Sequence, residues 1–445
     1  MTTLDVARSP FELSVRVSLA DKFLHIMLYL CILSSFFVFV QPAPYEYLAV
    51  VLGFACVLAR VTFSRMVLPV LVLLLIHDAG GAIGLWRLAQ FGWPRLTGEG
   101  PVVLLEDYGY GDSARFLATS FYLGLTGVMF ACMFAQDTMR RIATVRSAYV
   151  MAGVIASLLG TIGYFDLYFQ FIPGLEIFSI NDRAVAGFKE PDIFGCYLIP
   201  PLTWLIERLI VDKVRPYNLI ATIIIFIGLL LAFSRAAWGS FALSTALLIY
   251  LLFVTQNDGR TRKRIIYFVA GGAVVGAVIF MLLMSVPVVS DTFAQRFHVV
   301  QYYDVAGDNR SRILLQQQSL REIFTHPFGM APWGFAHDTN WVSHNVYLST
   351  MLNDGWLGGI AYSTLVVLTL ITGFKFLWVR TPWQTFLIAT YFPFLGLVLE
   401  ALIADTDHWR HFYLLLGLIW GLGAATVKFC RRQTWPEEIL AHARV

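Results

Sequence analysis

The stretch at residues 265–287 decides the fold: it reads IIYFVAGGAVVGAVIFMLLMSVP, carries no charged side chain, and follows the basic run RKR at residues 262–264. A helix of about 20 apolar residues crosses the roughly 30 Å hydrocarbon core of a bilayer, so this run is long enough to span it. Lys and Arg collect at the cytoplasmic ends of such helices. The stretch therefore predicts a transmembrane helix that begins on the cytoplasmic side.

The composition extends this prediction to the whole chain. Of the 445 residues, 58% are hydrophobic and only 14% are charged, and the mean hydropathy is +0.68. Soluble domains carry about 25% charged residues, so this composition excludes a soluble enzyme. The net charge of +3 gives no reason to expect a nucleic-acid partner. We therefore expect an all-α polytopic membrane protein, in which residues 1–445 form a single integral membrane domain embedded in membrane lipids.

Apolar runs of spanning length predict about 12 transmembrane helices. The Lys and Arg residues between the runs collect in alternate loops, and such basic loops stay on the cytoplasmic side. This pattern predicts that both termini are cytoplasmic. The runs lie at residues 23–41, 46–64, 66–86, 114–135, 147–168, 192–212, 217–234, 236–254, 265–287, 346–373, 384–403 and 411–428.

Three segments on the opposite, outer side are too long to be turns. They are residues 87–113, 169–191 and 288–345. The third segment is a large loop inserted between predicted helices 9 and 10. The pair DN at residues 308–309 can cap a helix inside this loop, and the proline at residue 327 can end it. Between these signals Ile313, Leu320 and Phe324 recur at near-helical spacing, so we predict a partly helical loop.

Several cations lie in the predicted outer segments, where they oppose the predicted topology. They are Arg183, Lys189, Arg235, Arg310 and Arg312. Arg235 occupies a short corner between two spans, which holds it near the lipid headgroups. A planar guanidinium binds phosphate through two parallel hydrogen bonds, so several such groups would form a diphosphate site. The alternative is that each cation contacts lipid phosphates or pairs with an acidic neighbour, of which the candidates are Asp182, Asp304 and Asp308.

His344 lies where the large outer loop enters the next predicted helix. An unperturbed histidine titrates at about pH 6.5, so it can accept a proton at neutral pH. A helix N-terminus disfavours the charged form of a nearby imidazole, which keeps it available as a base. These properties suit a general base. The alternative is an interfacial histidine that caps the helix or hydrogen-bonds a carbonyl group.

The chain has few signs of a metal site. Its five cysteines form no CxxC and no Cys/His zinc spacing. Asp405 and Asp407 form a DxD, the spacing with which soluble glycosyltransferases hold a divalent metal under a nucleotide sugar. Nucleotide sugars are not expected on the outer side, so helix capping or pairing with Arg410 is the favoured interpretation.

Three ionisable residues lie inside predicted spans. His77 and Asp78 lie in the third span and Glu400 lies in the eleventh. Ionisable groups inside a membrane are costly and are therefore functional candidates by default. They could mark a proton path, which leaves a transporter open as an alternative, although the chain has no internal repeat of the kind common in transporters.

The sequence around His344 resembles the signature of the O-antigen ligases, within a larger group that also holds O-antigen polymerases and bacterial O-linked oligosaccharyltransferases. That signature is His followed by Asn, Ser or Gln, then a nine-residue gap and Gly-x-x-Gly. The chain has His344-Asn345 and then GWLG at residues 355–358. The segment at residues 183–194 resembles another part of the family pattern, Arg, then Gly-Phe, then Pro-Asn, but has Asp192 where the family usually has Asn. Other segments that resemble the family are the corner Ser234-Arg235 and NRSR at residues 309–312.

The resemblance, which covers about residues 150–430, implies a membrane glycosyltransferase. Its members transfer O-antigen polysaccharide from undecaprenyl diphosphate to a sugar hydroxyl of lipid A-core, with inversion and without a metal or other cofactor. The reaction takes place at the periplasmic face of the inner membrane of a Gram-negative bacterium, so the large outer loop is expected to be periplasmic. The implied roles are catalysis by His344, diphosphate binding by Arg183, Arg235, Arg310 and Arg312, and support by Asn345, Lys189 and Ser234.

Two alternatives remain open at the level of sequence. An O-antigen polymerase or an O-linked oligosaccharyltransferase of the same group would use similar chemistry on another acceptor. A proton-coupled transporter would depend on the intramembrane ionisable residues and not on His344.

Overall fold

The structure is a computed structural model that describes residues 18–40, 42–93, 109–212, 214–256, 258–297, 312–339 and 342–442, without the side chains of residues 297, 312, 338 and 432–442. Within these ranges the protein is helical apart from one small sheet. The sheet pairs β1 (Ser179–Ile180) with β2 (Arg183–Ala184) in antiparallel register, with Ser179 opposite Ala184. The predicted all-α class is confirmed.

The helices are numbered in the order in which they occur along the chain. They are α1 (Leu19–Leu33), α2 (Pro44–Leu58), α3 (Leu68–Phe91), α4 (Tyr110–Phe134), α5 (Thr138–Phe169), α6 (Pro191–Tyr197), α7 (Ile199–Val211), α8 (Pro216–Leu231), α9 (Arg235–Thr255), α10 (Gly259–Met284), α11 (Pro287–Phe297), α13 (Arg312–Thr325), α14 (Gly334–Thr339), α15 (Val346–Leu377), α16 (Gln384–Glu400) and α17 (Arg410–His442). Short 3-10 helices are η1 (Ser34–Phe36), η2 (Arg65–Val67) and η3 (Leu175–Phe178).

Nine helical segments among the described residues are long and apolar enough to cross a membrane. Three shorter apolar helices, α2, α8 and α16, accompany them. Each of the twelve predicted runs overlaps one of these twelve helical segments, so the sequence located the apolar helices correctly. The number that cross the bilayer stays a prediction, because α2, α8 and α16 are shorter than a typical span.

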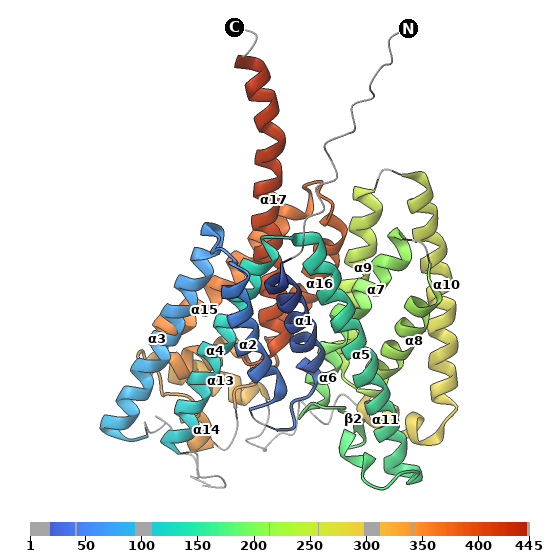
Figure 1. The fold of residues 1–445 in the computed structure, drawn as a ribbon. Helices are drawn as coiled ribbons and strands as arrows, with labels where there is room; N and C mark the ends of the chain where they lie inside the picture. Colours follow the sequence, from blue (N-terminus) through green and yellow to red (C-terminus); the bar gives the residue numbers. More distant parts are fainter. Residues whose placement is uncertain are drawn as a thin grey trace, which may run out of the picture.

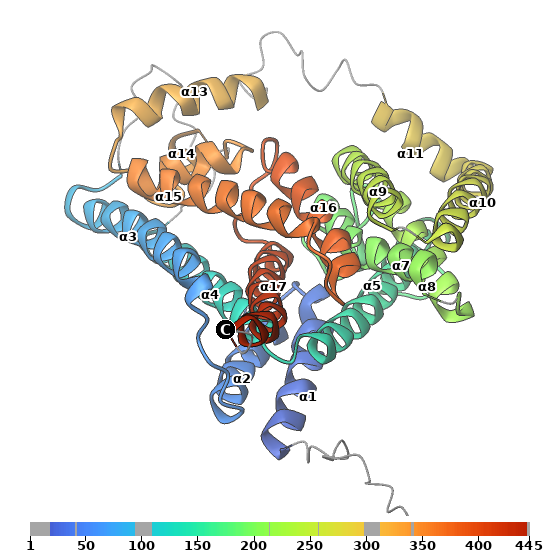
Figure 2. The ribbon, with the colours of Figure 1, turned by 90° about the horizontal axis from the view of Figure 1, so that it is seen from above.

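The apolar stretch at residues 265–287 forms most of α10, at the periphery of the helix bundle. Only 6% of the most apolar 18-residue stretch of α10 is buried inside the protein. Figure 2 shows α10 at the edge of the molecule, beside α9 and far from α17. The part of α10 at residues 265–284 is uncharged, and a segment of this kind that buries so little of its surface in protein needs an apolar solvent, which a bilayer provides.

The elements from the predicted outer segments gather at one end of the molecule. Figure 1 shows α13, α14 and the strand β2 at the end opposite to the projecting carboxyl-terminal part of α17. The predicted large outer loop is partly helical, as expected, since it contains most of α11 together with α13 and α14.

The helix predicted within the large loop is α13, which ends at Thr325, just before His326 and Pro327. The apolar stripe that the sequence picked out does not form its packed face. Ile313, Leu320 and Phe324 are 51%, 51% and 68% exposed. The buried residues are Leu315, Ser319, Glu322 and Ile323.

Glycines allow α3 and α15 to pack backbone to backbone. A Cβ on Gly80 of α3 would lie 2.4 Å from the carbonyl oxygen of Asp354 and 2.7 Å from the nitrogen of Gly358, both on α15. Gly355 interrupts α15 with φ +68°, a conformation that L side chains rarely adopt. Its backbone packs directly against the backbone of residues 327–329 in the large loop. The Gly-x-x-Gly part of the signature therefore holds α15 against α3 and against the large loop.

Candidate functional site

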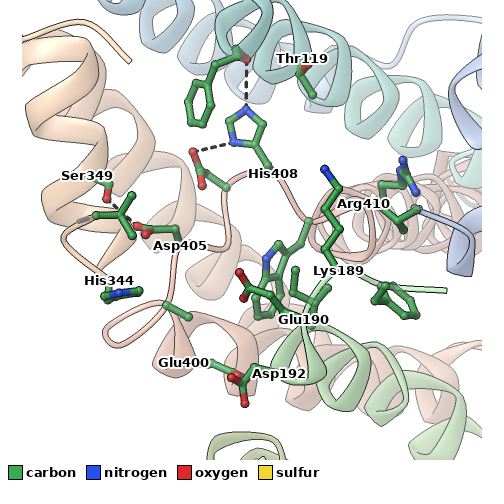
Figure 3. A pocket seen from close by; sticks show the side chains of 18 of the residues that line it. Thr119, Lys189, Glu190, Asp192, His344, Ser349, Glu400, Asp405, His408 and Arg410 are labelled. Carbon is green, nitrogen blue, oxygen red and sulfur yellow. Dashed lines mark hydrogen bonds and ion pairs between the residues drawn. The ribbon is translucent and has the colours of Figure 1, made fainter. Parts of the chain in front are cut away.

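A cavity of about 1600 Å³ lies among the predicted outer segments. Four residues proposed from the sequence line it: Arg183, Lys189, Arg235 and His344. They come from β2, from the segment before α6, from the first residue of α9 and from the segment before α15. Figure 3 shows His344 and Lys189 on different sides of this space. Arg183 and His344, 161 positions apart in the chain, thus line one cavity.

Arg183 is held in place by two hydrogen bonds. Its Nε donates to the carbonyl oxygen of Ala232 at 2.9 Å, and its terminal nitrogen donates to Asp192 Oδ1 at 2.7 Å. The side chain is 11% exposed, so its position is fixed by packing as well. Asp192 is the residue at which this sequence departs from the family pattern, and it forms an ion pair with Arg183. Asp192 is not among the acidic neighbours that the sequence suggested as partners, which were Asp182, Asp304 and Asp308.

Arg235 is placed by the N-terminus of α9. Ser234 is the N-cap of that helix, and its hydroxyl accepts a hydrogen bond from the amide of Ala237 at 3.3 Å. The preceding Phe233 has φ +46°, which makes the corner between α8 and α9 tight. No described residue forms a hydrogen bond or ion pair with the Arg235 side chain, which is partly exposed in the cavity. Its fork of donors therefore remains available to a ligand.

Further cations line the same cavity. Lys189 is exposed and has no ion-pair partner among the described residues. Arg296 of α11 donates a hydrogen bond to the carbonyl oxygen of Asn181 at 3.3 Å. No pattern in the sequence predicted Arg296 at this cavity. Arg310 lies outside the described residues. Arg312 is the first residue of α13, but its side chain lies outside the description, so both remain predictions.

His344 immediately precedes the N-cap of α15, as the sequence predicted. Asn345 is that cap, and its Oδ1 accepts hydrogen bonds from the amides of Tyr347 at 3.1 Å and Leu348 at 3.3 Å. His344 has φ +51°, a costly conformation for a residue with a Cβ. Its carbonyl oxygen accepts a hydrogen bond from Gln316 of α13 at 3.4 Å. Asn345 thus caps the helix that follows His344 directly in the chain.

A chain of short hydrogen bonds runs beside His344. The hydroxyl of Ser343 lies 2.6 Å from the hydroxyl of Ser349, and Ser349 donates to Asp405 Oδ1 at 2.5 Å. Burial, together with the negative charge of Asp407, raises the pKa of Asp405 to about 7. The sequence offered one signal for Ser349, because it lies one helical turn after Asn345 and hence on the same face.

The two carboxylates of the DxD have different partners, since Asp407 pairs with His408 and Asp405 accepts a hydrogen bond from Ser349. Burial disfavours the charge on Asp407, but His408, whose Nδ1 lies 2.9 Å from Asp407 Oδ2, lowers the pKa of Asp407. Burial likewise opposes the charge on His408, yet Asp407 raises its pKa, so the two form an ion pair. Figure 3 shows this contact at the cavity wall. The expected pairing with Arg410 is wrong, because Arg410 binds Glu46, with its Nε 2.8 Å from Glu46 Oε1.

The described residues contain no group of three or more His, Cys, Asp or Glu side chains that could hold a metal ion. The cavity nevertheless has many carboxylates. Those that line it are Glu46, Asp112, Glu190, Asp192, Glu400, Asp405 and Asp407. Six arginines and lysines of the described chain line it as well, namely Arg115, Arg183, Lys189, Arg235, Arg296 and Arg410. We call Arg183, Lys189, Arg235 and Arg296 the cationic wall, and a polyanionic ligand would be attracted to them.

The intramembrane ionisable residues divide into two sets. His77 packs between helices, with its Nδ1 3.5 Å from Asp354 Oδ2 on α15 and 3.2 Å from the carbonyl oxygen of Gly358. Asp78 has a buried oxygen without a hydrogen-bond partner in the described part of the chain. Glu400 lines the cavity and accepts a hydrogen bond from the thiol of Cys196 at 2.6 Å. His77 and Asp78 are not cavity-lining residues, so they do not join the His344 site.

Comparison with known proteins adds no identification. No protein-family model matches the chain, and a search of curated proteins finds no match.

Proposed function

We propose that the protein is a membrane glycosyltransferase that transfers O-antigen polysaccharide from undecaprenyl diphosphate to lipid A-core. The observation that supports this most is the convergence of His344, Arg183, Lys189 and Arg235 on one cavity. These residues belong to segments that lie far apart in the chain. A base on one side of a cavity and several cations on another side fit a glycosyl donor that carries a diphosphate leaving group.

In the proposed reaction His344 is the general base. Its imidazole takes the proton from the acceptor hydroxyl while that oxygen attacks the anomeric carbon of the donor sugar. The bond between the anomeric carbon and the diphosphate breaks, undecaprenyl diphosphate leaves with the electron pair, and the configuration inverts. General-base catalysis contributes about 10² to 10⁴ in rate.

The cationic wall would bind the diphosphate and stabilise the charge that grows on it as the bond breaks. The guanidinium of Arg235 would bind with all of its donors, because no described residue is hydrogen-bonded to it. Arg183 would bind through the donors that Asp192 and Ala232 leave free. Arg310 and Arg312 complete the proposed set, with Lys189 in support. Removing one preorganised donor of this kind costs about 3–4 kcal/mol of transition-state stabilisation.

The proposal places the protein in the inner membrane of a Gram-negative bacterium, with the cavity on the periplasmic side and both termini in the cytoplasm. Both substrates are lipids, so a cavity inside a membrane domain is reached without moving them into water. The reaction needs no cofactor, since the cationic side chains take the place of the divalent ion used by soluble glycosyltransferases.

An in vitro ligation assay tests this function. Purified protein in nanodiscs is given undecaprenyl-diphosphate-linked O-antigen and lipid A-core, with EDTA present. We expect polysaccharide to appear on lipid A-core, His344→Ala to reduce the rate by about 10² or more, and donor binding to persist. The matched control is His337→Ala, in an outer helix but not at the cavity, which should keep wild-type activity.

Other outcomes of the same assay would replace the proposal. Longer glycan on undecaprenyl diphosphate, with unmodified lipid A-core, would identify a polymerase. Full activity of His344→Ala would remove the general base, and a requirement for divalent metal would bring back the DxD. A transporter would form no glycosidic product and would depend on His77 and Asp78.

A further inference from the structure

Helix α13 has two apolar faces, and the protein covers only one of them. Leu315 and Ile323 are buried against a small cluster with Met330, Phe335 and Leu352. On the opposite side Ile313, Leu320 and Phe324 form a stripe that is half exposed or more. A helix on a protein surface ordinarily presents polar residues on its outer side, so this second stripe needs an apolar environment of its own.

The stripe is continuous with the outward surface of α15. The rings of Phe324 and Trp356 lie 6.2 Å apart, edge to face, and Trp356 Nε1 donates a hydrogen bond to the carbonyl oxygen of Ile323 at 2.8 Å. Along α15, Leu357 and Ile360 follow and are 52% and 54% exposed. Since α15 is long and apolar enough to cross a membrane, this outward surface is one that lipid would contact.

Cations border the same surface. Arg87, near the end of α3, places its guanidinium carbon 5.2 Å above the ring of Phe328, which is 57% exposed and follows α13. Arg321 on α13 is exposed to one side of the apolar stripe. A charged head beside an apolar face is typical of groups at the boundary between headgroups and acyl chains. Trp356 fits the same level, because tryptophan is enriched there.

We propose that α13 is an interfacial helix whose Ile313–Leu320–Phe324 face lies in the outer acyl-chain region of the bilayer that α15 crosses. Helices of this kind sit with their apolar face about 5–10 Å below the headgroups. The large loop would then be fixed at a set height on the membrane, and the start of α13 would be held beside the cavity. This inference needs only a membrane protein and does not depend on the glycosyltransferase activity.

A second copy of the chain is a poorer occupant. A stable protein interface buries about 800 Å² on each partner, far more than a stripe of three side chains supplies. Lipid also accounts for the continuity with α15 and for the bordering arginines, which a partner protein would leave unexplained.

Site-directed fluorescence in nanodiscs tests the position of the stripe. Four of the native cysteines, Cys31, Cys56, Cys132 and Cys196, are buried. Replacing the partly exposed Cys430 by Ser therefore leaves only buried native cysteines, so that a single introduced cysteine can be labelled selectively. An environment-sensitive fluorophore is attached at Phe324→Cys. Its emission is measured with lipids brominated at shallow or deep acyl positions and with aqueous iodide.

We expect blue-shifted emission at Phe324→Cys and stronger quenching by shallow bromines than by deep bromines or iodide. Leu320→Cys should behave alike, which guards against a single variant that fails to fold. Arg321→Cys should be quenched by iodide, and Val367→Cys, exposed on α15, should be quenched by deep bromines. Iodide quenching at residues 320 and 324 would overturn the proposal. Protection from both quenchers would also overturn it, because protein would then cover the stripe.

Discussion

Arg183 and Arg235 illustrate how neighbouring cations in one cavity differ at the level of single residues. Arg183 is locked by Asp192 and by a backbone carbonyl, whereas no described residue holds the guanidinium of Arg235. The sequence could flag both, because each is a cation in a predicted outer segment. It could not distinguish them, because the partner of Arg183 depends on how the chain turns between β2 and α6.

Arg235→Lys separates charge from geometry. Lysine keeps the positive charge but loses the fork that contacts two phosphate oxygens, so the exchange is not conservative at such a site. We expect kcat/KM for ligation to fall by about 10². The control is Arg208→Lys on α7, which pairs with Asp212 away from the cavity and should keep normal turnover. Wild-type turnover of Arg235→Lys would reduce Arg235 to a lipid anchor.

Asp405 should give the protein a pH-dependent stability. Burial and the nearby Asp407 raise its pKa to about 7, from an ordinary value of about 4. A carboxyl with a raised pKa contributes stability that is complete below its ordinary pKa and is lost as the pH rises through the raised value. We expect the melting temperature in detergent to fall between about pH 4 and about pH 8, and to fall less in Asp405→Asn.

The matched control for this pH experiment is Asp291→Asn. Asp291 is an exposed carboxylate on α11 without a described partner, so its removal should leave the slope of the wild type. An unchanged slope in Asp405→Asn would show that Asp405 does not titrate in this range.

At the scale of elements, the packing of α3 on α15 positions the segment that carries His344. The sequence could locate both helices and could identify Gly-x-x-Gly as part of a signature. It could not assign that glycine pair a structural role, because the role depends on the backbone of a helix some 270 residues earlier. The sequence also shows the apolar residues of α13. It does not show which of them pack against the protein, because α13 carries apolar residues on two faces.

Gly80→Ala tests the contact between these helices. The added Cβ would meet backbone atoms of Asp354 and Gly358 closer than 3 Å, and backbone cannot rotate away as a side chain can. Overpacking of this kind costs about 1–3 kcal/mol, so we expect a lower melting temperature in detergent. Gly271→Ala on α10 is the control, because its Cβ would meet nothing within 4 Å. Equal melting temperatures for the two variants would mean that α3 and α15 can move apart freely.

At the scale of the whole molecule, the apolar runs predicted the helices well because hydrophobic length is a property of each segment alone. The buried pairs were not predictable in this way. Arg410 with Glu46 and His77 with Asp354 each join helices that are far apart in the sequence. Their geometry depends on which helices pack together, and a single sequence carries no direct record of that.

The cavity wall begins near the amino end of the described chain, at Ser35, and reaches His411 at the start of the last long helix. Translation proceeds from the first of these residues to the last, so a growing chain has no complete wall until α17 has left the ribosome and entered the bilayer. The cavity wall is therefore complete only once α17 has been inserted. A chain that stalls earlier would lack His408, Arg410 and His411 from the cavity wall.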